Sequence, residues 1–244
     1  MSEFVLTNVR LFAVGADLTG ASNKVELGAE HEEKETTNYL SNGWKEVIAG
    51  LGSAEISGEG QWEAGSSALV DDASWAQLGG VGPWTVCPAD AQVSSLAYLT
   101  NALRADYKLG DAVGEVAPWT GTAKSSWPLV RGQVGHPPGL ARTASGSGTA
   151  VQLGAVPAGK RLYAALHVLS AAGTTPSLTV SVESDDAVGM ASPTSRLTFA
   201  AAAAAGGQIL RTDGTAITDT YYRAAWTVSG TSPSFMFALA FGIR

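Results

Sequence analysis

Residues 24–63 read KVELGAEHEEKETTNYLSNGWKEVIAGLGSAEISGEGQWE, and this stretch decides the expected fold of the chain. Apolar or small side chains alternate with charged or polar ones on both sides of a turn-rich connector that contains Trp44. Because successive side chains of a β-strand point to opposite faces, the stretch predicts two long strands, each with one acidic face. If the two strands share a sheet, six carboxylates lie on one surface: Glu26, Glu30, Glu32, Glu55, Glu59 and Glu63.

Two interpretations of this acidic face are open on composition alone. Like charges on neighbouring strands destabilise a sheet, so a fold that keeps them is expected to need a negatively charged surface. The simpler interpretation is a solvated outer face that keeps the protein soluble. The other is a surface that repels polyanions.

The composition of the 244 residues favours β structure. The chain is 45% hydrophobic and only 15% charged, and it contains 29 glycines, which fits turn-rich strands better than helical bundles. The net charge of −7 is uneven, because residues 1–141 hold 17 of the 22 acidic residues and 8 of the 15 basic ones. This asymmetry indicates two parts with different surroundings. Ordinary duplex binding by the first part is not expected, since it requires Lys and Arg to replace counterions.

The cellular context follows from three further features. Cys87 is the only cysteine, so neither an intramolecular disulfide nor a thiolate metal cluster is expected. Residues 1–3 lead into a strand pattern without the basic and apolar segments of a signal peptide. The longest apolar run, residues 199–205, is too short to span a bilayer. We therefore expect a chain that is made and assembled in a cytoplasm, with no membrane partner.

The first part, residues 1–136, is expected to contain helical segments among its strands. Val93, Leu96, Leu99 and Leu103 recur at near-helical spacing, which predicts the best helix of the chain over residues 92–105. A shorter helix is expected over residues 71–78, and one helical turn over residues 44–48.

A linker and a second β domain are expected after residue 136. Residues 137–148 contain Pro137-Pro138-Gly139 and a low-complexity run of Ala, Ser and Gly, which is typical of a domain boundary. Turn signals at residues 157–159, 173–176 and 229–233 separate short strands in residues 149–244. The six expected strands cover residues 149–156, 161–170, 177–184, 196–202, 217–228 and 234–243. The expected fold class is therefore mainly β: an antiparallel β-sandwich or partial barrel with one short helix, followed by a second β-sandwich-like domain.

The last expected strand is apolar or small on both faces. Phe235 and Phe237 point one way, whereas Met236 and Ala238 point the other. Such a strand is either central in its domain or buried by another subunit. Four aromatic residues are therefore candidates for contacts between subunits: Trp44, Trp75, Phe235 and Phe237.

The sequence shows no pattern of catalytic or ligand-binding chemistry. A dinucleotide fingerprint, a phosphate-binding loop and a Gly-x-Ser-x-Gly elbow are all missing. His31, His136 and His167 are far apart in the sequence, and the pairs Asp71-Asp72 and Asp185-Asp186 are typical of solvated loops. We expect no enzymatic activity, no catalytic residues, no cofactor and no metal.

Several segments resemble the major tail (tail tube) proteins of long-tailed, siphovirus-type bacteriophages. In these proteins a strand ends in a Thr-rich loop, a Gly-Trp and a Gly-Leu follow, and a Ser/Gly-rich strand comes next. The matching segments here are KETT at 34–37, GWKEVIAGL at 43–51 and AEISGEG at 54–60. Others are similar to those of phages with actinobacterial hosts: LAYL at 96–99, VGEVAP at 113–118, PLVRG at 128–132, TDTYYR at 218–223 and SGTSPSF at 229–235.

The resemblance implies a structural virion protein of tail-tube fold. Such proteins stack as rings, usually hexameric, in which long strands line a channel for DNA, and an acidic lining lets the duplex slide rather than bind. The implied partners are further copies of the chain, a tape-measure protein and tail terminator and tip proteins, with phage DNA passing without specific binding. The expected location is the virion tail, assembled in the bacterial cytoplasm.

Stoichiometry and function each keep an alternative. If only the first half lines the channel, six chains form the ring and residues 149–244 decorate its outside, whereas three chains suffice if both halves line it. The loop at residues 65–83 and both termini are candidates for contacts between rings. The alternative function is a virion decoration protein or adhesin that binds a host glycan, which predicts discrete oligomers with exposed Trp or Tyr.

Overall fold

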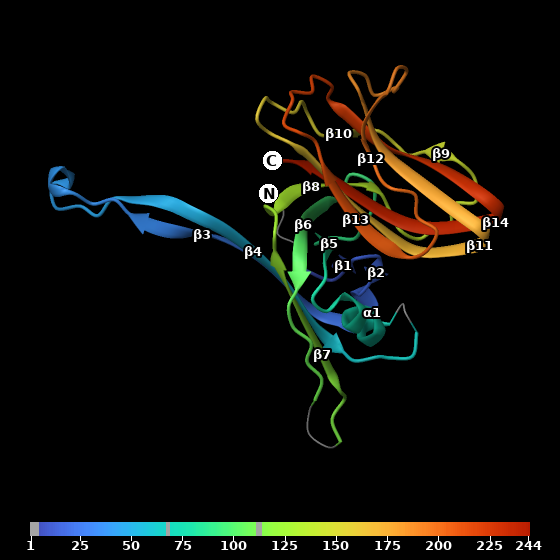
Figure 1. Ribbon diagram of the computed structural model, residues 1–244, viewed down its shortest axis with the longest axis horizontal. Helices are drawn as coiled ribbons and strands as arrows, with labels where there is room; N and C mark the ends of the chain where they lie inside the picture. Colours follow the sequence, from blue (N-terminus) through green and yellow to red (C-terminus); the bar gives the residue numbers. More distant parts are fainter. Residues whose placement is uncertain (1–4, 67–68, 111–113) are drawn as a thin grey trace.

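Antiparallel strands make up most of the computed structural model, which describes residues 5–66, 69–110 and 114–244 (Figure 1). The strands are β1 (Arg10–Ala13), β2 (Ala16–Asp17), β3 (Ser22–Glu35), β4 (Val47–Gln61), β5 (Val81–Cys87), β6 (Leu96–Arg104), β7 (Pro118–Ser125), β8 (Val130–His136), β9 (Gly146–Ser147), β10 (Val151–Gln152), β11 (Leu162–Asp185), β12 (Thr194–Thr198), β13 (Gly206–Arg211) and β14 (Tyr221–Ile243). They join in one hydrogen-bonded network whose main path runs β12-β11-β14-β8-β6-β5-β1-β2. The prediction of a mainly β, antiparallel protein with one short helix is confirmed.

Strands β3 and β4 form a long hairpin, here called the arm (residues 22–61), which projects from the rest of the chain (Figure 1). β4 begins at Val47, earlier than the expected residue 54, because Val47 and Ile48 pair with Glu35 and Lys34 of β3. The predicted helical turn at residues 44–48 is therefore wrong. The connector instead contains a short 3-10 turn, Tyr39–Ser41, in which the Asn38 side chain accepts a hydrogen bond from the Leu40 N–H.

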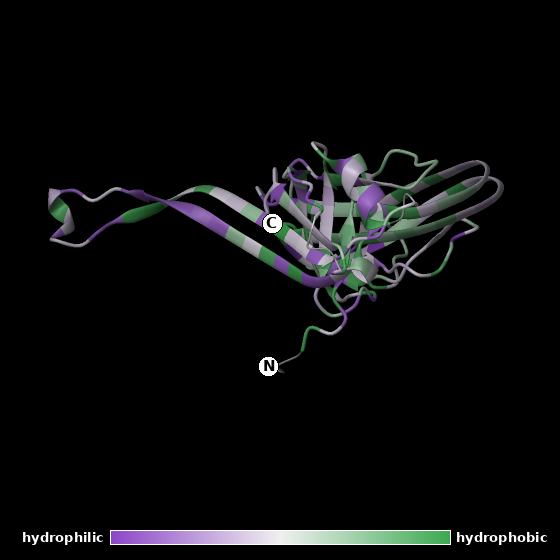
Figure 2. Ribbon diagram, turned by 90° about the horizontal axis from the view of Figure 1, so that it is seen from below, coloured by the Kyte–Doolittle hydropathy of each residue, from purple (hydrophilic) through white to green (hydrophobic). Residues whose placement is uncertain are grey.

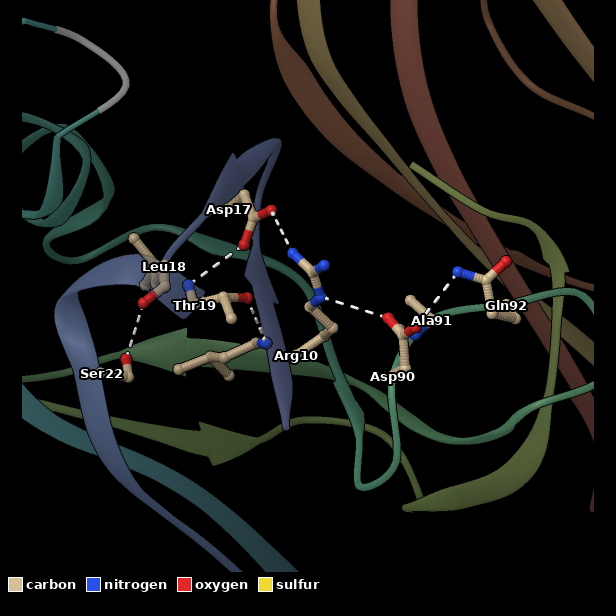
Figure 3. A network of polar contacts seen from close by, with 9 residues as sticks. Arg10, Asp17, Leu18, Thr19, Ser22, Asp90, Ala91 and Gln92 are labelled. Carbon is tan, nitrogen blue, oxygen red and sulfur yellow. Dashed lines mark hydrogen bonds and ion pairs between the residues drawn. The ribbon is translucent and has the colours of Figure 1, made fainter. Parts of the chain in front are cut away.

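A polar network around Arg10 fixes the start of the arm (Figure 3). The Arg10 guanidinium lies 3.8 Å from an oxygen of Asp17 and 3.4 Å from an oxygen of Asp90. Asp17 also accepts a hydrogen bond from the Thr19 N–H, and the Ser22 hydroxyl, at the start of β3, donates to the Leu18 carbonyl. A hydrogen bond from the Ala91 backbone N–H, followed by one from the Gln92 side-chain amide, lowers the pKa of Asp90, so this partner of Arg10 stays ionised.

The helix predicted over residues 92–105 is wrong, because Leu96–Arg104 forms strand β6. β6 pairs with β5 on one side and β8 on the other, so its backbone is satisfied in the sheet. The leucine spacing coincided with a helical period, yet burial alternates: Ala97, Leu99 and Ala102 are buried, whereas Leu96 and Leu103 are only half-buried. The helix of the described chain is α1 (Val70–Gln77), close to the shorter helix expected over residues 71–78.

Strands β11 and β14 run side by side over almost their whole length, from the pair Leu162–Ile243 to the pair Asp185–Tyr221. The turns predicted at residues 173–176 and 229–233 are therefore wrong, because both strands continue through them. What lies there is a kink in each strand: GTTPS at residues 173–177 faces GTSPS at residues 230–234. Gly173 and Gly230 have φ of 116° and 117°, and a Cβ on either would lie within 3 Å of a carbonyl oxygen of the other strand. We call this pair of segments the double corner.

The double corner folds the paired strands β11 and β14, here called the ribbon, back on themselves. The parts of the ribbon on either side of the double corner pack together as a β-sandwich. Their facing side chains form one buried cluster, which includes Leu166, Val180, Tyr222, Phe235 and Phe237. Phe235 and Phe237 have no exposed surface and belong to the core of the chain itself. The prediction that they contact other subunits is therefore wrong. The opposite side of β14, with Ala238 and Ala240, packs against residues of the first half such as Phe12 and Leu99.

The two halves of the chain share this sheet. Leu239 of β14 pairs with His136 of β8, so hydrogen bonding passes from residues 1–136 directly into residues 149–244. The expected linker, residues 137–148, lies along β14, with Arg142 paired to Phe235 and Gly146 paired to Trp226. Segments 1–136 and 149–244 are thus joined by strand pairing as well as by the chain.

Candidate functional site

The register of the arm places four of the six singled-out carboxylates on one face. Directly opposed residues of an antiparallel pair share a face, and Gly28 is opposite Glu55. The other pairs of this face are Lys24–Glu59, Glu26–Ser57 and Glu30–Ser53. We call it the acidic face, and its carboxylates are Glu26, Glu30, Glu55 and Glu59. The opposite face carries Val25, Leu27, Ala29 and His31, opposed by Gly58, Ile56, Ala54 and Gly52.

The other two glutamates have different surroundings. Glu32 lies within the register shift of β3 between His31 and Glu33. Its carboxylate forms an ion pair of 2.8 Å with Lys34. Glu63 lies after the end of β4 at Gln61, so the expectation that it belongs to the strand is wrong. Its backbone carbonyl accepts a hydrogen bond from the Asp71 N–H at the start of α1.

Strand β7 extends the acidic face, which the sequence pattern did not indicate. Lys124 is opposite Glu55, Thr122 is opposite Ser57, and Thr120 is opposite Glu59. A concave surface of about 830 Å³ lies here, lined by Glu26, Glu30, Glu55 and Lys124 among others. The residues of β7 lie about 70 positions from their β4 partners in sequence, so no local sequence pattern could have shown that they extend the acidic face.

Lysines neutralise the acidic face only in part. The Lys24 ammonium lies 2.9 Å from Glu26 and 3.1 Å from Glu59, and hydrogen bonds to Glu26 and then Glu59 raise the pKa of Lys24. Glu30 accepts a hydrogen bond from the Ser53 hydroxyl at 3.2 Å. The face therefore combines four carboxylates with two ammonium groups on paired, solvent-facing strands.

The far end of the arm includes hydrophobic stretches of backbone among hydrophilic ones (Figure 2). Trp44 is 80% exposed, and four more apolar side chains there are mostly exposed: Tyr39, Leu40, Ile48 and Leu51. We call these five residues the apolar tip. Trp75, the other surface tryptophan that we singled out, is 65% exposed on α1 and meets Tyr107 edge to face.

A second concave surface, which we call the Trp127 groove, lies at the root of the arm. Its volume is about 300 Å³. It is lined by Ala29, Glu30, His31, Gly52, Ser53 and Ala54 of the arm and by Ser125, Ser126, Trp127, Pro128, Leu129 and Arg244. The guanidinium of Arg211 lies over the Trp127 ring, 4.4 Å from its centroid, and Trp127 also contacts Tyr163. The groove thus combines apolar surface with one lining arginine, Arg244, and one carboxylate, Glu30.

The described residues contain no group of three or more His, Cys, Asp or Glu side chains that could hold a metal ion. His31 is exposed on the arm, whereas burial lowers the pKa of His136 to about 4 and that of His167 to about 3. Burial raises the pKa of the Cys87 thiol to about 12, which suppresses the nucleophilic thiolate. Within the described ranges, no helix has the length and apolar character needed to cross a membrane.

Comparison with known proteins gives weak likenesses. No family model matches the sequence, and no curated protein matches it significantly. A chain of the virion of a native gene transfer agent particle has 15% identity and a TM-score of 0.44, over 52% of this chain and 97% of that one. A chain from the sheath/tube terminator of the extracellular contractile injection system PVC has 13% identity and a TM-score of 0.43, over 54% and 97%. The Dit (gp 19.1) protein of SPP1 has 12% identity and a TM-score of 0.36, over 97% and 99%. At these values the likenesses assign neither a family nor a function to the chain.

Proposed function

We propose that this chain is a structural protein of a phage tail, which assembles as stacked rings into a tube with an acidic lining. The observation that carries the proposal is the acidic face, where Glu26, Glu30, Glu55 and Glu59 share one side of the sheet formed by β3, β4 and β7. Its segments are those in which the sequence resembles tail tube proteins. The expected location is the virion tail, after assembly in the host cytoplasm.

The charge of this face suits a channel for DNA. A duplex carries one negative charge for about every 1.7 Å of its length, and a basic wall would bind it through released counterions. Carboxylates repel the duplex and keep it in the middle of a water-filled channel. Because charges are screened within about 8 Å at physiological ionic strength, the crowding of the carboxylates themselves costs less in such a channel.

An open edge of the sheet fits assembly into rings. Within the described residues β3 pairs only with β4, which leaves the other edge of a 14-residue strand without a partner. Long exposed edges invite pairing with another chain, and closing a sheet into a ring removes them. We propose that neighbouring copies cover this edge.

Six chains in a ring are the proposed stoichiometry. The acidic alternation occurs in β3 and β4 of the first half, whereas the second half exposes mixed residues such as Thr179, Ser181 and Glu183 between buried ones. We propose that residues 149–244 lie outside the channel, with a ring of three chains as the alternative. A tape-measure protein inside the tube and terminator and tip proteins at its ends are the further partners implied by the sequence resemblance.

Charge reversal on the acidic face tests the proposal. The variant Glu26→Lys, Glu30→Lys, Glu55→Lys, Glu59→Lys should still form tubes in negative-stain electron microscopy, because all four side chains face solvent. DNA delivery by particles that carry it should be slowed or blocked. The matched control replaces the same residues with Gln and should deliver DNA at an intermediate or normal rate. Normal delivery by the Lys variant would refute the acidic-channel function.

A virion decoration protein or glycan-binding adhesin is the second candidate. The observation in its favour is the contact of exposed Trp75 with half-buried Tyr107 beside the Asp71 carboxylate, which accepts a hydrogen bond from Tyr107. Aromatic rings next to polar groups are suited to sugars, which have apolar and hydroxyl faces. Light scattering separates the candidates: the adhesin predicts discrete oligomers that never stack.

A further inference from the structure

Within the part of the chain that the structure describes, the side chains of the apolar tip are left mostly uncovered. Tyr39, Leu40 and Trp44 lie at the far end of the arm (Figure 1). The seven residues from Ala29 to Glu35 alone separate the tip from the root by about 20 Å, at the usual rise of a strand. Because β3 and β4 are paired along this length, the tip cannot fold back on its own root. Exposed apolar surface of this kind marks a site of contact with another protein.

Two concave surfaces at the root of the arm could receive such a tip from another copy, and they differ in charge. The larger one is lined by Glu26, Glu30 and Glu55, with Lys124 as a cation. The Trp127 groove is lined by Trp127, Pro128 and Leu129 with Arg244, and Arg211 lies over Trp127. The two surfaces adjoin and share Glu30, but the groove adds the apolar residues Trp127, Pro128 and Leu129 and places Arg244 beside that single carboxylate.

The charge of the tip selects between these surfaces. Residues 32–46 include four glutamates and two lysines, and all six side chains are exposed: Glu32, Glu33, Lys34, Glu35, Lys45 and Glu46. A net negative tip is repelled more by the larger surface, with three carboxylates and one ammonium group, than by the Trp127 groove, where Arg244 offsets the single carboxylate of Glu30. Both partners also carry the residue types that dominate contact energies, Trp in the tip and Trp with Arg in the groove.

We propose that the apolar tip of one copy docks in the Trp127 groove of a second copy, with Trp44 as the apolar anchor. The proposal rests on the self-assembly proposed above and names the contact that joins successive copies. The contact is heterologous, since tip and groove are different surfaces of the same chain. A repeated heterologous contact builds a ring or an open helical array rather than a closed two-fold dimer.

Disulfide trapping between two single variants tests this contact. Lys45→Cys places a thiol beside Trp44 and keeps the anchor, and Ser126→Cys places one in the groove with almost no change in size. Cys87 is buried and adds no reactive background. Mild oxidation of the mixed variants should give a covalent dimer that neither variant gives alone. The matched control, Lys45→Cys with Thr122→Cys, places the second thiol on the acidic face of the sheet, opposite Ser57, and should give no more dimer than the single variants.

Four outcomes would overturn the proposal. A dimer from Lys45→Cys alone would show that tips meet tips, and an equal yield with Thr122→Cys would show that the tip lies on the acidic face. Absence of the mixed dimer in preparations that electron microscopy shows to contain rings or tubes would remove this contact and leave the tail function standing. A chain that forms no oligomer at any concentration would count against both the contact and the tail function.

Discussion

Thr174 of β11 lies directly opposite Thr231 of β14 at the point where the ribbon folds back, and the same Gly-Thr-x-Pro-Ser pattern surrounds both residues. The kink has local two-fold symmetry: Gly173 lies against the Ser232 carbonyl, and Gly230 lies against the Thr175 carbonyl. Thr175 and Ser232 both adopt positive φ, 47° and 49°. The sandwich of the second half depends on this matched pair of kinks.

Replacing Gly173 or Gly230 with Ala should therefore lower the free energy of unfolding by about 1–3 kcal/mol for each residue, through strain and overpacking. Urea unfolding followed by tryptophan fluorescence measures the loss. Gly189→Ala is the matched control, because no atom lies within 4 Å of its added Cβ, and it should stay within about 0.5 kcal/mol of the parent. Unchanged stability in both corner variants would mean that the ribbon does not fold as described.

The stability should fall as the pH is lowered from about 6.5 to about 4, and His136 should contribute to the fall. Its ring accepts a hydrogen bond from the Arg142 guanidinium at 3.1 Å, and burial, followed by the nearby Arg142 charge, lowers its pKa to about 4. The unfolded chain thus binds a proton in this interval that the folded chain excludes, so the stabilisation is complete above pH 6.5 and lost on acidification. His167, with a pKa of about 3 because of burial, should act in the same direction.

Denaturant titrations at pH 7 and pH 5 measure this slope. His136→Gln keeps a hydrogen-bond acceptor for Arg142 but cannot take up a proton, so its stability should depend less on pH. His31→Gln changes an exposed histidine of the arm and should leave the slope as it is. Equal slopes for all three proteins would assign the acid sensitivity to other groups.

Trp44→Ser should weaken self-association by about tenfold or more and leave the free energy of unfolding unchanged. The ring is 80% exposed, so its loss leaves no cavity in the fold, whereas an aromatic anchor in an interface contributes about 2 kcal/mol or more. Sedimentation velocity gives the association constant. Val188→Ser removes an exposed apolar side chain from the second half and serves as the control. A similar effect of both variants would show that the arm has no special role in self-association.

Arg104 should be replaceable by Met but not by Ala. Its buried guanidinium lies between Trp84 and Trp119, 5.8 and 5.6 Å from their ring centroids, and donates to the carbonyls of Asp106 and Thr120. Burial lowers the pKa of Arg104, and its Nη1 has no hydrogen-bond partner among the described residues. Met fills most of the volume without a buried charge. The free energy of unfolding of Arg104→Met should therefore lie within about 2 kcal/mol of that of the parent, or above it.

Arg104→Ala should cost about 3 kcal/mol or more, since it leaves a cavity between two tryptophans. Thermal unfolding by calorimetry compares the variants. If Met destabilises the chain as much as Ala does, the charge itself is needed, and the idea of a merely space-filling role is lost.

Local patterns predicted the parts of the fold whose burial is one-sided. The arm was predictable because Glu26, Leu27 and their neighbours alternate between solvent and apolar faces. The segment from Leu96 to Leu103 was misleading because its leucines recur at a helical spacing, whereas the alternating burial of β6 falls mainly on small or polar residues such as Ala97, Thr100 and Ala102. The double corner was mistaken for two turns, since Gly-Thr-x-Pro is equally suited to a turn and to a kink; only the pairing of Thr174 with Thr231 distinguishes them.

The candidate site was predictable only where it lies in one segment. The acidic face followed from the arm itself, whereas Lys124 joins it through β7, and Trp127, Arg211 and Arg244 meet through strands far apart in sequence. Phe235 and Phe237 looked like surface anchors because their strand is apolar on both sides. Their real cover is the other half of the same ribbon, which no local pattern reveals.

The position of β14 at residues 221–243 has a consequence for biosynthesis. This strand pairs with β8, β9, β10 and β11, so all four lack this partner until β14 has been synthesised. Leu162 emerges 81 residues before its partner Ile243, a delay of about 4–16 s at ordinary translation rates. During this interval β12 and β13 can pair with one edge of β11, but its other edge lacks β14, and the slow, non-local pairing that follows closes the sandwich in one late step.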